Sequence, residues 1–402
     1  MVIPNKWVIT LLLLALVARI WAALAIGGGY HFADEAIYVD TARRLSEGAG
    51  FGVEYPLVPG YPVFLTLLSL GLPTSLTFLR AGQAAVAALG TVFVFRLADR
   101  MFGRRTAIAA GLVYALDPLL VISSGLLYPE AVAALLVPLV VLTALESAER
   151  DALARSAIAG ALLGILALLR PVALVLPPVV ASWIGVTVTA RPKRRVAHIA
   201  ALGLGFLLVL APWTARNLWT HARLVPVATA GSRMAPGGQD EVARRGLLGS
   251  LAYWAWSDPE DFASQVTRRF VQFWELTPTR LVTDDPVKRE ELHRRDPRLE
   301  VQALFSRSLR DRVSAISFAL ELSLALVGLV VVARTRWRQT LLAVVVIIAY
   351  AAGYALFVAK LRYRIPILPL LFLFTGAGVA AVYSLVRRPG ASAGSSSAAP
   401  KS

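Results

Sequence analysis

The amino-acid sequence predicts an all-α polytopic membrane protein with about ten transmembrane helices, short helices at the outer membrane surface and a partly helical extracytoplasmic segment. Composition is the first reason: of 402 residues, 57% are hydrophobic and 16% are charged, and the mean hydropathy is +0.65. A soluble domain of this size could not cover so much apolar surface with polar residues. The second reason is the order along the chain, where apolar runs long enough to cross a bilayer alternate with short basic clusters.

The first apolar run follows Lys6 and continues to about Ile26. A positive residue before an apolar run also begins a signal peptide. This run is long enough to span, however, and further spans follow it, which favours an uncleaved first helix. The predicted spans are residues 7–27, 78–97, 106–122, 131–147, 156–170, 172–190, 197–212, 313–333, 340–358 and 366–386.

The distribution of arginine predicts which side each loop faces, because cytoplasmic loops are enriched in Lys and Arg. Whether the segment 61–72 crosses the membrane decides which side every later loop faces. This segment is apolar, but it is short and flanked by Pro and Gly. If this segment stays on the outer side and the N-terminus is cytoplasmic, the basic residues that fall inside are Arg100, Arg104, Arg105, Arg150, Arg155, Arg191, Lys193, Arg194, Arg195, Arg334, Arg336, Arg338, Arg387 and Arg388. If it crossed, all of them would face outward. We therefore predict an interfacial or re-entrant helix at 61–72 and two cytoplasmic termini.

This topology divides the chain into regions. They are a membrane core at 1–212 with a first outer loop at 28–77, an extracytoplasmic segment at 213–312, C-terminal transmembrane helices at 313–388 and a Ser/Ala/Gly-rich tail at 389–402, predicted to be disordered. Within the extracytoplasmic segment, Asp258 followed by Pro259 is typical of a helix start. The apolar residues that recur every four positions after it are Phe262, Val266, Phe270 and Trp274. They predict a helix that lies on the bilayer surface or packs on the spans. Residues 282–311 are highly charged and also compatible with a helix.

Two features of the composition exclude other classes of function. The net charge is +16, which in a soluble protein would indicate nucleic-acid binding, but here the basic residues lie between apolar runs as topology signals. We therefore expect no nucleic-acid partner. The chain has no cysteine, which excludes disulfides and thiolate metal sites.

Carboxylates stand out in the predicted outer loops. Asp34 and Glu35 follow the first span, and Glu130 follows Pro129 at the outer end of another. The ordinary interpretation of Asp34 and Glu35 is that they are solvated loop residues. That of Glu130 is an acidic residue stabilised at a helix N-terminus. A carboxylate beside lipid binds protons more readily than one in bulk water, which suits a general base. Glu54 is a further outward carboxylate. Together with the outward His31 and His221, these carboxylates leave a hard divalent ion open as a cofactor.

Basic residues also occur on the predicted outer side, against the general trend. The densest group is Lys360, Arg362 and Arg364, and Arg170 and Arg216 each lie at the boundary of a span. Such side chains can extend to lipid phosphates, which is the ordinary interpretation. The density at one helix start favours an anionic ligand, since the guanidinium fork matches phosphate geometry. Outward acids together with outward arginines fit a reaction between a hydroxyl nucleophile and a sugar phosphate.

A set of short motifs, in this order, carries a resemblance to a known family. They are Ala33-Asp34-Glu35-Ala36-Ile37-Tyr38, Tyr55-Pro56 through Gly60-Tyr61-Pro62, Arg80, Phe102-Gly103-Arg104-Arg105, Tyr128-Pro129-Glu130, Leu169-Arg170-Pro171, Pro212-Trp213-Thr214-Ala215-Arg216-Asn217 and Arg362-Tyr363-Arg364-Ile365-Pro366-Ile367-Leu368-Pro369. Through nearly its whole length the sequence resembles bacterial members of the GT-C glycosyltransferase class, in the group that includes the protein O-mannosyltransferases and the lipid A aminoarabinose transferase. The chain is short for that class, because it lacks a large C-terminal periplasmic domain.

The resemblance implies roles for the matched positions. Asp34 corresponds to the acid of the first outer loop, a catalytic base or acceptor-positioning group, and Glu130 to the acid of the second. Arg362 and Arg364 fall where such proteins bind the lipid phosphate. Glu54 lies near a metal-binding glutamate of some relatives without matching it cleanly. The remaining residues expected to contact substrate are Glu35, Tyr55, Tyr61, Arg80, Arg170, Arg216, Lys360 and Tyr363.

The implied function is transfer of a hexosyl or pentosyl group from a polyprenyl-phosphate donor to a hydroxyl of a cell-envelope lipid, glycan or protein. The protein would act at the outer face of the bacterial cytoplasmic membrane, by one inverting displacement. The alternative is a membrane transporter or lipid flippase, which charges near the bilayer midplane would favour. Most charges lie at the predicted interfaces. Arg19 and Glu321 are the partial exceptions, with snorkelling or helix–helix pairing as their ordinary interpretation.

Overall fold

The computed structural model describes most of the chain. The described residues are 6–52, 55, 57–72, 74–188, 191–222, 225–227, 238–277, 286–295, 297–299, 307–358 and 360–386. Glu54, which was considered as a metal ligand, and the tail at 389–402 lie outside these residues. Within them, every regular element is a helix, apart from an isolated bridge between Tyr30 and Leu299.

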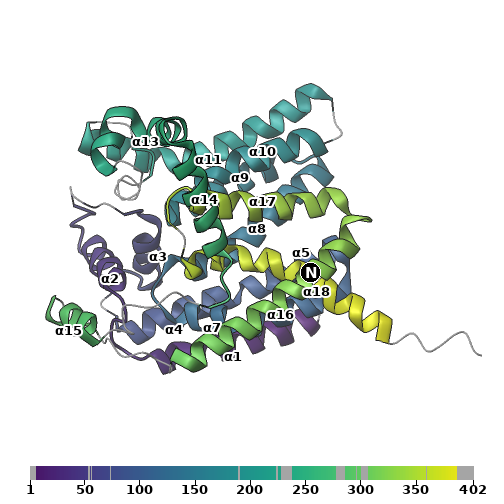
Figure 1. The fold of residues 1–402 in the computed structure, drawn as a ribbon, viewed down its shortest axis with the longest axis horizontal. Coiled ribbons are helices and arrows are strands. Elements are labelled where there is room, and N and C mark those ends of the chain that lie inside the picture. Colours follow the sequence, from purple (N-terminus) through teal and green to yellow (C-terminus); the bar gives the residue numbers. More distant parts are fainter. Residues whose placement is uncertain are drawn as a thin grey trace, which may run out of the picture.

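Long apolar helices form a bundle that makes up the body of the molecule (Figure 1). They are α1 (Lys6–Ile26), α4 (Leu76–Ala88) continuing into α5 (Gly90–Phe102), α6 (Arg104–Leu116), α7 (Pro118–Gly125), α8 (Pro129–Arg150), α9 (Leu153–Leu169), α10 (Leu176–Thr187) after the 3-10 helix η1 (Pro171–Val175), α11 (Pro192–His221), α16 (Arg307–Ala333), α17 (Trp337–Ala355), and α18 (Leu368–Val386) after the 3-10 helix η3 (Leu361–Ile367). The shorter helices outside the bundle are α2 (Ala33–Ser46), α3 (Gly60–Leu68), α13 (Gly238–Ser257), α14 (Pro259–Phe273) and α15 (Pro286–Arg295).

Each of the ten predicted spans coincides with a helix or a helix pair of this bundle. Among the described residues, seven helices are long and apolar enough to cross a membrane. The predicted span 106–122 corresponds to α6 and α7, a pair bent by 48°. The predicted spans 156–170 and 172–190 correspond to the shorter apolar helices α9 and η1–α10. The class of polytopic all-α membrane protein is therefore confirmed, and a full crossing by the shorter helices stays a prediction.

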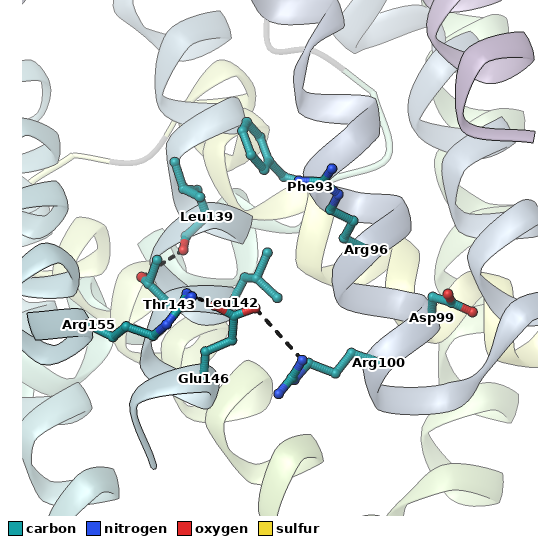
Figure 2. Close-up of a pocket in the computed structure, with 9 residues that line it drawn as sticks. All are labelled: Phe93, Arg96, Asp99, Arg100, Leu139, Leu142, Thr143, Glu146 and Arg155. Atoms are coloured by element: carbon teal, nitrogen blue, oxygen red, sulfur yellow. Dashed lines mark hydrogen bonds and ion pairs between the residues drawn. The ribbon is translucent and has the colours of Figure 1, made fainter. Parts of the chain in front are cut away.

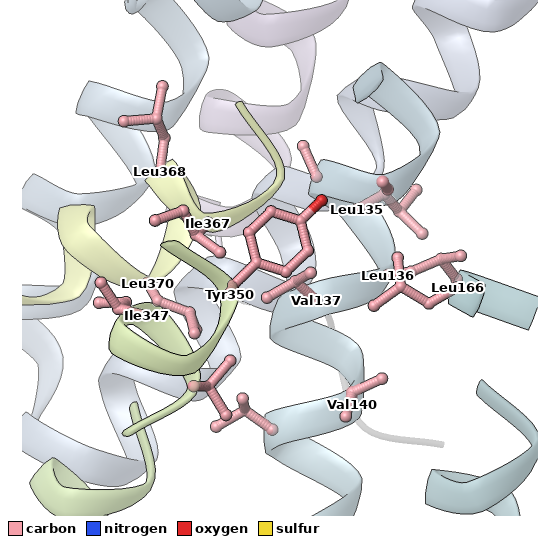
Figure 3. Packing of buried hydrophobic residues seen from close by; sticks show 14 of the residues in the cluster. Leu135, Leu136, Val137, Val140, Leu166, Ile347, Tyr350, Ile367, Leu368 and Leu370 are labelled. Carbon is pink, nitrogen blue, oxygen red and sulfur yellow. The ribbon is translucent and has the colours of Figure 1, made fainter. Parts of the chain in front are cut away.

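The core of the bundle is centred on α8. Most of its apolar window is buried inside the protein. In Figure 3, Tyr350 of α17 lies beside Val137 of α8, and Leu136 points toward Leu166 of α9. Close helix contacts depend on glycine: a Cβ on Gly160 of α9 would collide with the backbone of Leu202 in α11. Small residues allow such approach in a membrane, where packing rather than water exclusion holds helices together.

The segment 61–72 forms a helix of nine residues, Gly60–Leu68. At 1.5 Å per residue it is about 14 Å long, roughly half of what a bilayer requires. It packs beside α2 instead of crossing the bundle. In Figure 1, α2, α3, α13 and α15 gather at one end of the bundle, on the left. We call this the α2 end.

Loops that were predicted to be cytoplasmic meet at the other end of the bundle. Arg100 pairs with Glu149, and Arg194 donates to Asp151 at 2.9 Å. The side chain of Trp183 donates to the backbone carbonyl of Arg338. The structure thus brings together the loops that share a predicted side.

The extracytoplasmic helix predicted after Asp258 is α14, and its capping is confirmed, since Asp258 accepts a hydrogen bond from the backbone of Asp261 at 3.0 Å. The helix packs on α17, where Phe270 and Trp274 join the core and Arg269 donates to the Leu356 carbonyl. Of the two predicted placements, packing on the spans is the one observed.

We expect reporter fusions at Arg104 and Arg194 to report a cytoplasmic location, because both belong to the arginine-rich end of the bundle. A fusion within α14 is the matched control and is expected to report the outside. An external location for either arginine would reverse the assignment of the α2 end to the outer face.

Candidate active site

A buried ion pair ties the first outer loop to the bundle at the α2 end. Arg80 of α4 donates to Glu35 of α2 at 2.9 Å, and neither side chain has exposed surface. Glu35 also accepts from the backbone of His31 and Leu127, at 2.6 and 2.8 Å, while Arg80 donates to the carbonyl of Gly125. These two residues were expected to contact substrate. The structure places them in the scaffold, where they fix α2 against the loop before α8.

We expect Glu35→Gln to lower the thermal stability of the protein strongly. Removing one partner of a buried ion pair leaves the other charge unpaired and costs about 3–5 kcal/mol. Glu47→Gln is the control, since Glu47 is exposed at the end of α2. The measurement is thermal unfolding in detergent, and equal midpoints for Glu35→Gln and the wild type would contradict the scaffold role.

Asp34 points away from that pair, as expected of neighbouring positions about 100° apart on a helix. Its side chain is 45% exposed, and its Oδ2 lies 3.3 Å from Arg362 and 3.2 Å from the hydroxyl of Tyr128. Burial raises the pKa of the Tyr128 hydroxyl well above its usual value, so this group stays protonated and donates to Asp34. An accessible carboxylate is therefore held in place by a neutral donor and a cation.

Glu130, by contrast, is buried between two arginines. It forms an ion pair with Arg170, and its Oε1 lies 3.6 Å from Nε of Arg362. The Oε2 atom is buried and has no hydrogen-bond donor in the described part of the chain. Glu130 begins α8 and Arg170 ends α9, so the site lies at the point where helices of the core terminate. Arg362 is the residue that joins the two carboxylates.

Aromatic rings position the arginines. The guanidinium of Arg362 lies 4.4 Å from the Tyr128 ring centre, and both it and Arg170 lie 5.4 Å from that of Tyr363. Tyr363 in turn stacks on Tyr354 of α17, at 4.5 Å and nearly parallel. Stacking on a ring orients a guanidinium while leaving its edge available to a ligand.

The structure separates Arg364 from Arg362, with which it was paired in the prediction. Arg364 has almost no exposed surface, donates to the backbone carbonyl of Glu275 and lies 3.6 Å from the Phe318 ring centre. It therefore holds the end of α14 and the start of α18 together. Lys360 is exposed at the start of η3.

Other predicted residues also lie in the scaffold. The buried hydroxyl of Tyr61 donates to Gln83 at 2.5 Å, and that of Tyr55 donates to the carbonyl of Val58. Arg216 donates to the carbonyl of Gly52, so it ties the first outer loop to α11.

Comparison with known proteins agrees with this architecture. Residues 58–215, less than half of the chain, match the dolichyl-phosphate-mannose-protein mannosyltransferase family. The archaeal oligosaccharyltransferase AglB from Archaeoglobus fulgidus, in complex with an inhibitory peptide and a dolichol-phosphate, has a TM-score of 0.58 at 14% identity, over 97% of this chain and 53% of its own. ArnT from Cupriavidus metallidurans bound to undecaprenyl phosphate has a TM-score of 0.57 at 17% identity, over 94% of this chain and 61% of its own. The chain has the GT-C fold.

The predicted resemblance to GT-C glycosyltransferases is thereby confirmed. The apo state of the Cupriavidus ArnT has a TM-score of 0.59 at 16% identity, over 93% of this chain and 59% of its own. No curated protein matches the chain in sequence. The chain spans between about half and three-fifths of the length of these solved structures.

Sequence reasoning missed two residues of the site in this GT-C chain. Tyr128 was part of a recognised motif, but only the fold shows its hydroxyl on Asp34. Tyr354 carried no signal, because an aromatic residue near a helix end is also typical of a membrane-interface anchor. Contact between Tyr354 and Tyr363 could have been suspected only by docking the ends of consecutive helices against each other.

Among the described residues, no group of three His, Asp or Glu side chains is arranged to hold a metal ion. Glu35 is saturated by Arg80 and backbone donors, and Glu130 is flanked by Arg170 and Arg362. Arg170 and Arg362 therefore place positive charge beside Glu130, and a divalent ion as cofactor stays a prediction that the described residues do not test.

We expect EDTA treatment to leave the proposed transfer activity within about twofold, since two arginines already supply positive charge at the site. The assay compares EDTA-treated protein before and after addition of Mg²⁺ or Mn²⁺. If EDTA abolishes the activity and Mg²⁺ or Mn²⁺ restores it, this expectation is wrong. Glu54 would then be the first residue to test as a metal ligand.

Proposed function

We propose that the protein transfers a sugar from a polyprenyl-phosphate donor to a hydroxyl of a cell-envelope acceptor, at the outer face of the membrane. The observation that carries this proposal is Arg362, which contacts the accessible carboxylate of Asp34 and the buried carboxylate of Glu130. A carboxylate suited to act as a base and a guanidinium suited to bind phosphate are thus adjacent, at the end of the bundle where α2, α3, α13 and α15 gather (Figure 1). The GT-C fold and the phosphate-carrier lipids of the two similar structures support it.

The chemistry requires one displacement. Asp34 takes the proton of the acceptor hydroxyl, and the oxygen attacks the anomeric carbon of the donor. The bond between that carbon and the phosphate oxygen breaks, and polyprenyl phosphate leaves with the bonding pair. The new bond forms on the face opposite the leaving group, so the anomeric centre inverts. The free Oε2 of Glu130 is suited to accept a hydrogen bond from the sugar or the acceptor.

The arginines match the change in charge during this step. A polyprenyl-phosphate sugar carries one negative charge on its phosphodiester, and the departing monoester develops a second. Before donor binds, Arg362 and Arg170 are balanced by Asp34 and Glu130. When Arg362 moves its hydrogen bonds to the phosphate, Asp34 loses its cation and becomes a stronger base, while the leaving group is stabilised where charge develops.

The proposal is tested with purified protein in liposomes, given a panel of polyprenyl-phosphate sugars and extracted envelope acceptors. Mass spectrometry detects the product, and NMR shows the anomeric configuration. An inverted glycoside with release of polyprenyl phosphate supports the proposal. If no donor is consumed and the lipid instead moves between leaflets, the transporter or flippase alternative is correct.

The acceptor hydroxyl would be selected by the segment 213–312. Its helix α14 contacts η3, which carries Arg362 and Tyr363, so an acceptor bound there would lie beside the site. Parallel assays with lipid, glycan and protein acceptors distinguish these acceptor classes.

A further inference from the structure

A pocket lies toward the end of the bundle opposite the candidate active site (Figure 2). Its volume is about 590 Å³, and it lies between α5, α8 and the start of α9. Glu146, in its wall, is sixteen residues along α8 from Glu130, which is about 24 Å at 1.5 Å per residue. The pocket therefore does not belong to the site proposed for sugar transfer.

The lining of this pocket is amphipathic. Phe93, Leu139 and Leu142 form an apolar part. The polar part, also drawn in Figure 2, consists of Arg96, Asp99, Arg100, Thr143, Glu146 and Arg155. Because the apolar residues lie further from the helix ends than the charged ones, an occupant would be charged toward the membrane surface and apolar toward the membrane interior. This is the polarity of a membrane lipid.

Within the described residues, every charged side chain that lines the pocket forms an ion pair except Arg96. Arg100 contacts Glu146 and Glu149, Arg155 contacts Glu146, and Asp99 pairs with Arg104 at 3.3 Å. Arg96 is exposed and has no hydrogen-bond or ion-pair partner in the described part of the chain. It lies six residues before Phe102, the end of α5, which places it about 9 Å inside the helix end. A cation at that depth is costly unless an anion meets it.

We propose that this pocket binds the phosphate head group of an anionic membrane phospholipid, with Arg96 on the phosphate. The guanidinium fork suits a phosphodiester, and the apolar wall formed by Phe93 and Leu139 accommodates the upper part of an acyl chain. The neighbouring ion pairs keep Arg100 and Arg155 in place while leaving the charge of Arg96 unbalanced. A lipid bound in the pocket would hold α5 against α8, and α8 carries Glu130 in its first turn.

The test is native mass spectrometry of the purified full-length protein with phosphatidylglycerol, and inorganic phosphate as a separate arm. Arg96→Gln is expected to weaken lipid retention about tenfold or more, as for loss of a charge-assisted hydrogen bond pair. Arg105→Gln removes the same charge from an exposed position at the same end, outside the pocket, and is expected to retain lipid like the wild type.

Three results would overturn the proposal. One is equal lipid retention by Arg96→Gln and the wild type. Another is an equal loss in both variants, which would indicate general attraction to the cationic end of the bundle. Displacement of the lipid by inorganic phosphate at millimolar concentration would also overturn it, because the apolar wall would then contribute nothing. Sugar transfer is assayed separately, so failure of this proposal is distinguishable from failure of the proposed function.

Discussion

Asp34→Asn is expected to reduce sugar transfer by roughly a hundredfold or more, while donor binding and folding stay close to those of the wild type. The substitution keeps the size of the side chain and its contact with Tyr128 but removes the basic oxygen. Because Asp34 is 45% exposed and outside the buried Glu35–Arg80 pair, its loss should not disturb the scaffold. The measurement is the initial rate of transfer in liposomes, with thermal unfolding recorded on the same samples.

Asp40→Asn is the matched control for that experiment. Asp40 is on the same helix and is also accessible, but its partners are Arg43 and Arg298, not residues of the site. Its transfer rate should remain near that of the wild type. Full activity of Asp34→Asn would remove Asp34 from the role of base. A slow Asp40→Asn variant would show that the effect comes from a general disturbance of α2.

Much of the fold could be predicted from the sequence, because lipid imposes a simple rule on it. A span must be apolar over its whole length, so the positions of the spans follow from hydropathy alone. The start of α14 could be predicted equally well, because Asp258 and Pro259 cap a helix through contacts within four residues. Local rules of this kind need no knowledge of which helix packs on which.

The pairing of charged residues could not be predicted in the same way. Asp34 and Glu35 are neighbours in sequence, yet one is accessible and the other is buried against Arg80, forty-five residues later. Arg362 and Arg364 diverge for a comparable reason: in a 3-10 helix, the side chains of residues two positions apart point about 120° away from each other around the axis. Arg362 thus contacts Asp34, whereas Arg364 lies over Phe318. Which side chain of each cluster faces the site depends on helix docking.

Arg362→Ala is expected to weaken binding of the polyprenyl-phosphate donor by roughly tenfold to a hundredfold. A hydrogen bond to a charged group is worth about 1.5–3 kcal/mol, and each 1.4 kcal/mol is a factor of ten in affinity. Arg362→Lys should recover only part of the loss, because an ammonium cannot form the paired hydrogen bonds of a guanidinium or stack on Tyr128 in the same way. Donor affinity is measured by titration with a non-transferable polyprenyl-phosphate analogue.

Lys360→Ala provides the comparison within the same segment, since Lys360 is exposed and two residues away. If general attraction to a cationic segment governs donor binding, the two alanine variants should lose affinity equally, and salt should abolish the difference from the wild type. If Arg362 contacts the phosphate, only Arg362→Ala should lose affinity strongly, and it should also lower the transfer rate at saturating donor, because the leaving group gains charge beside it. Unchanged donor affinity in Arg362→Ala would leave Arg170, among the described arginines of the site, to bind the phosphate, and Arg362 would then serve only to bridge Asp34 and Glu130.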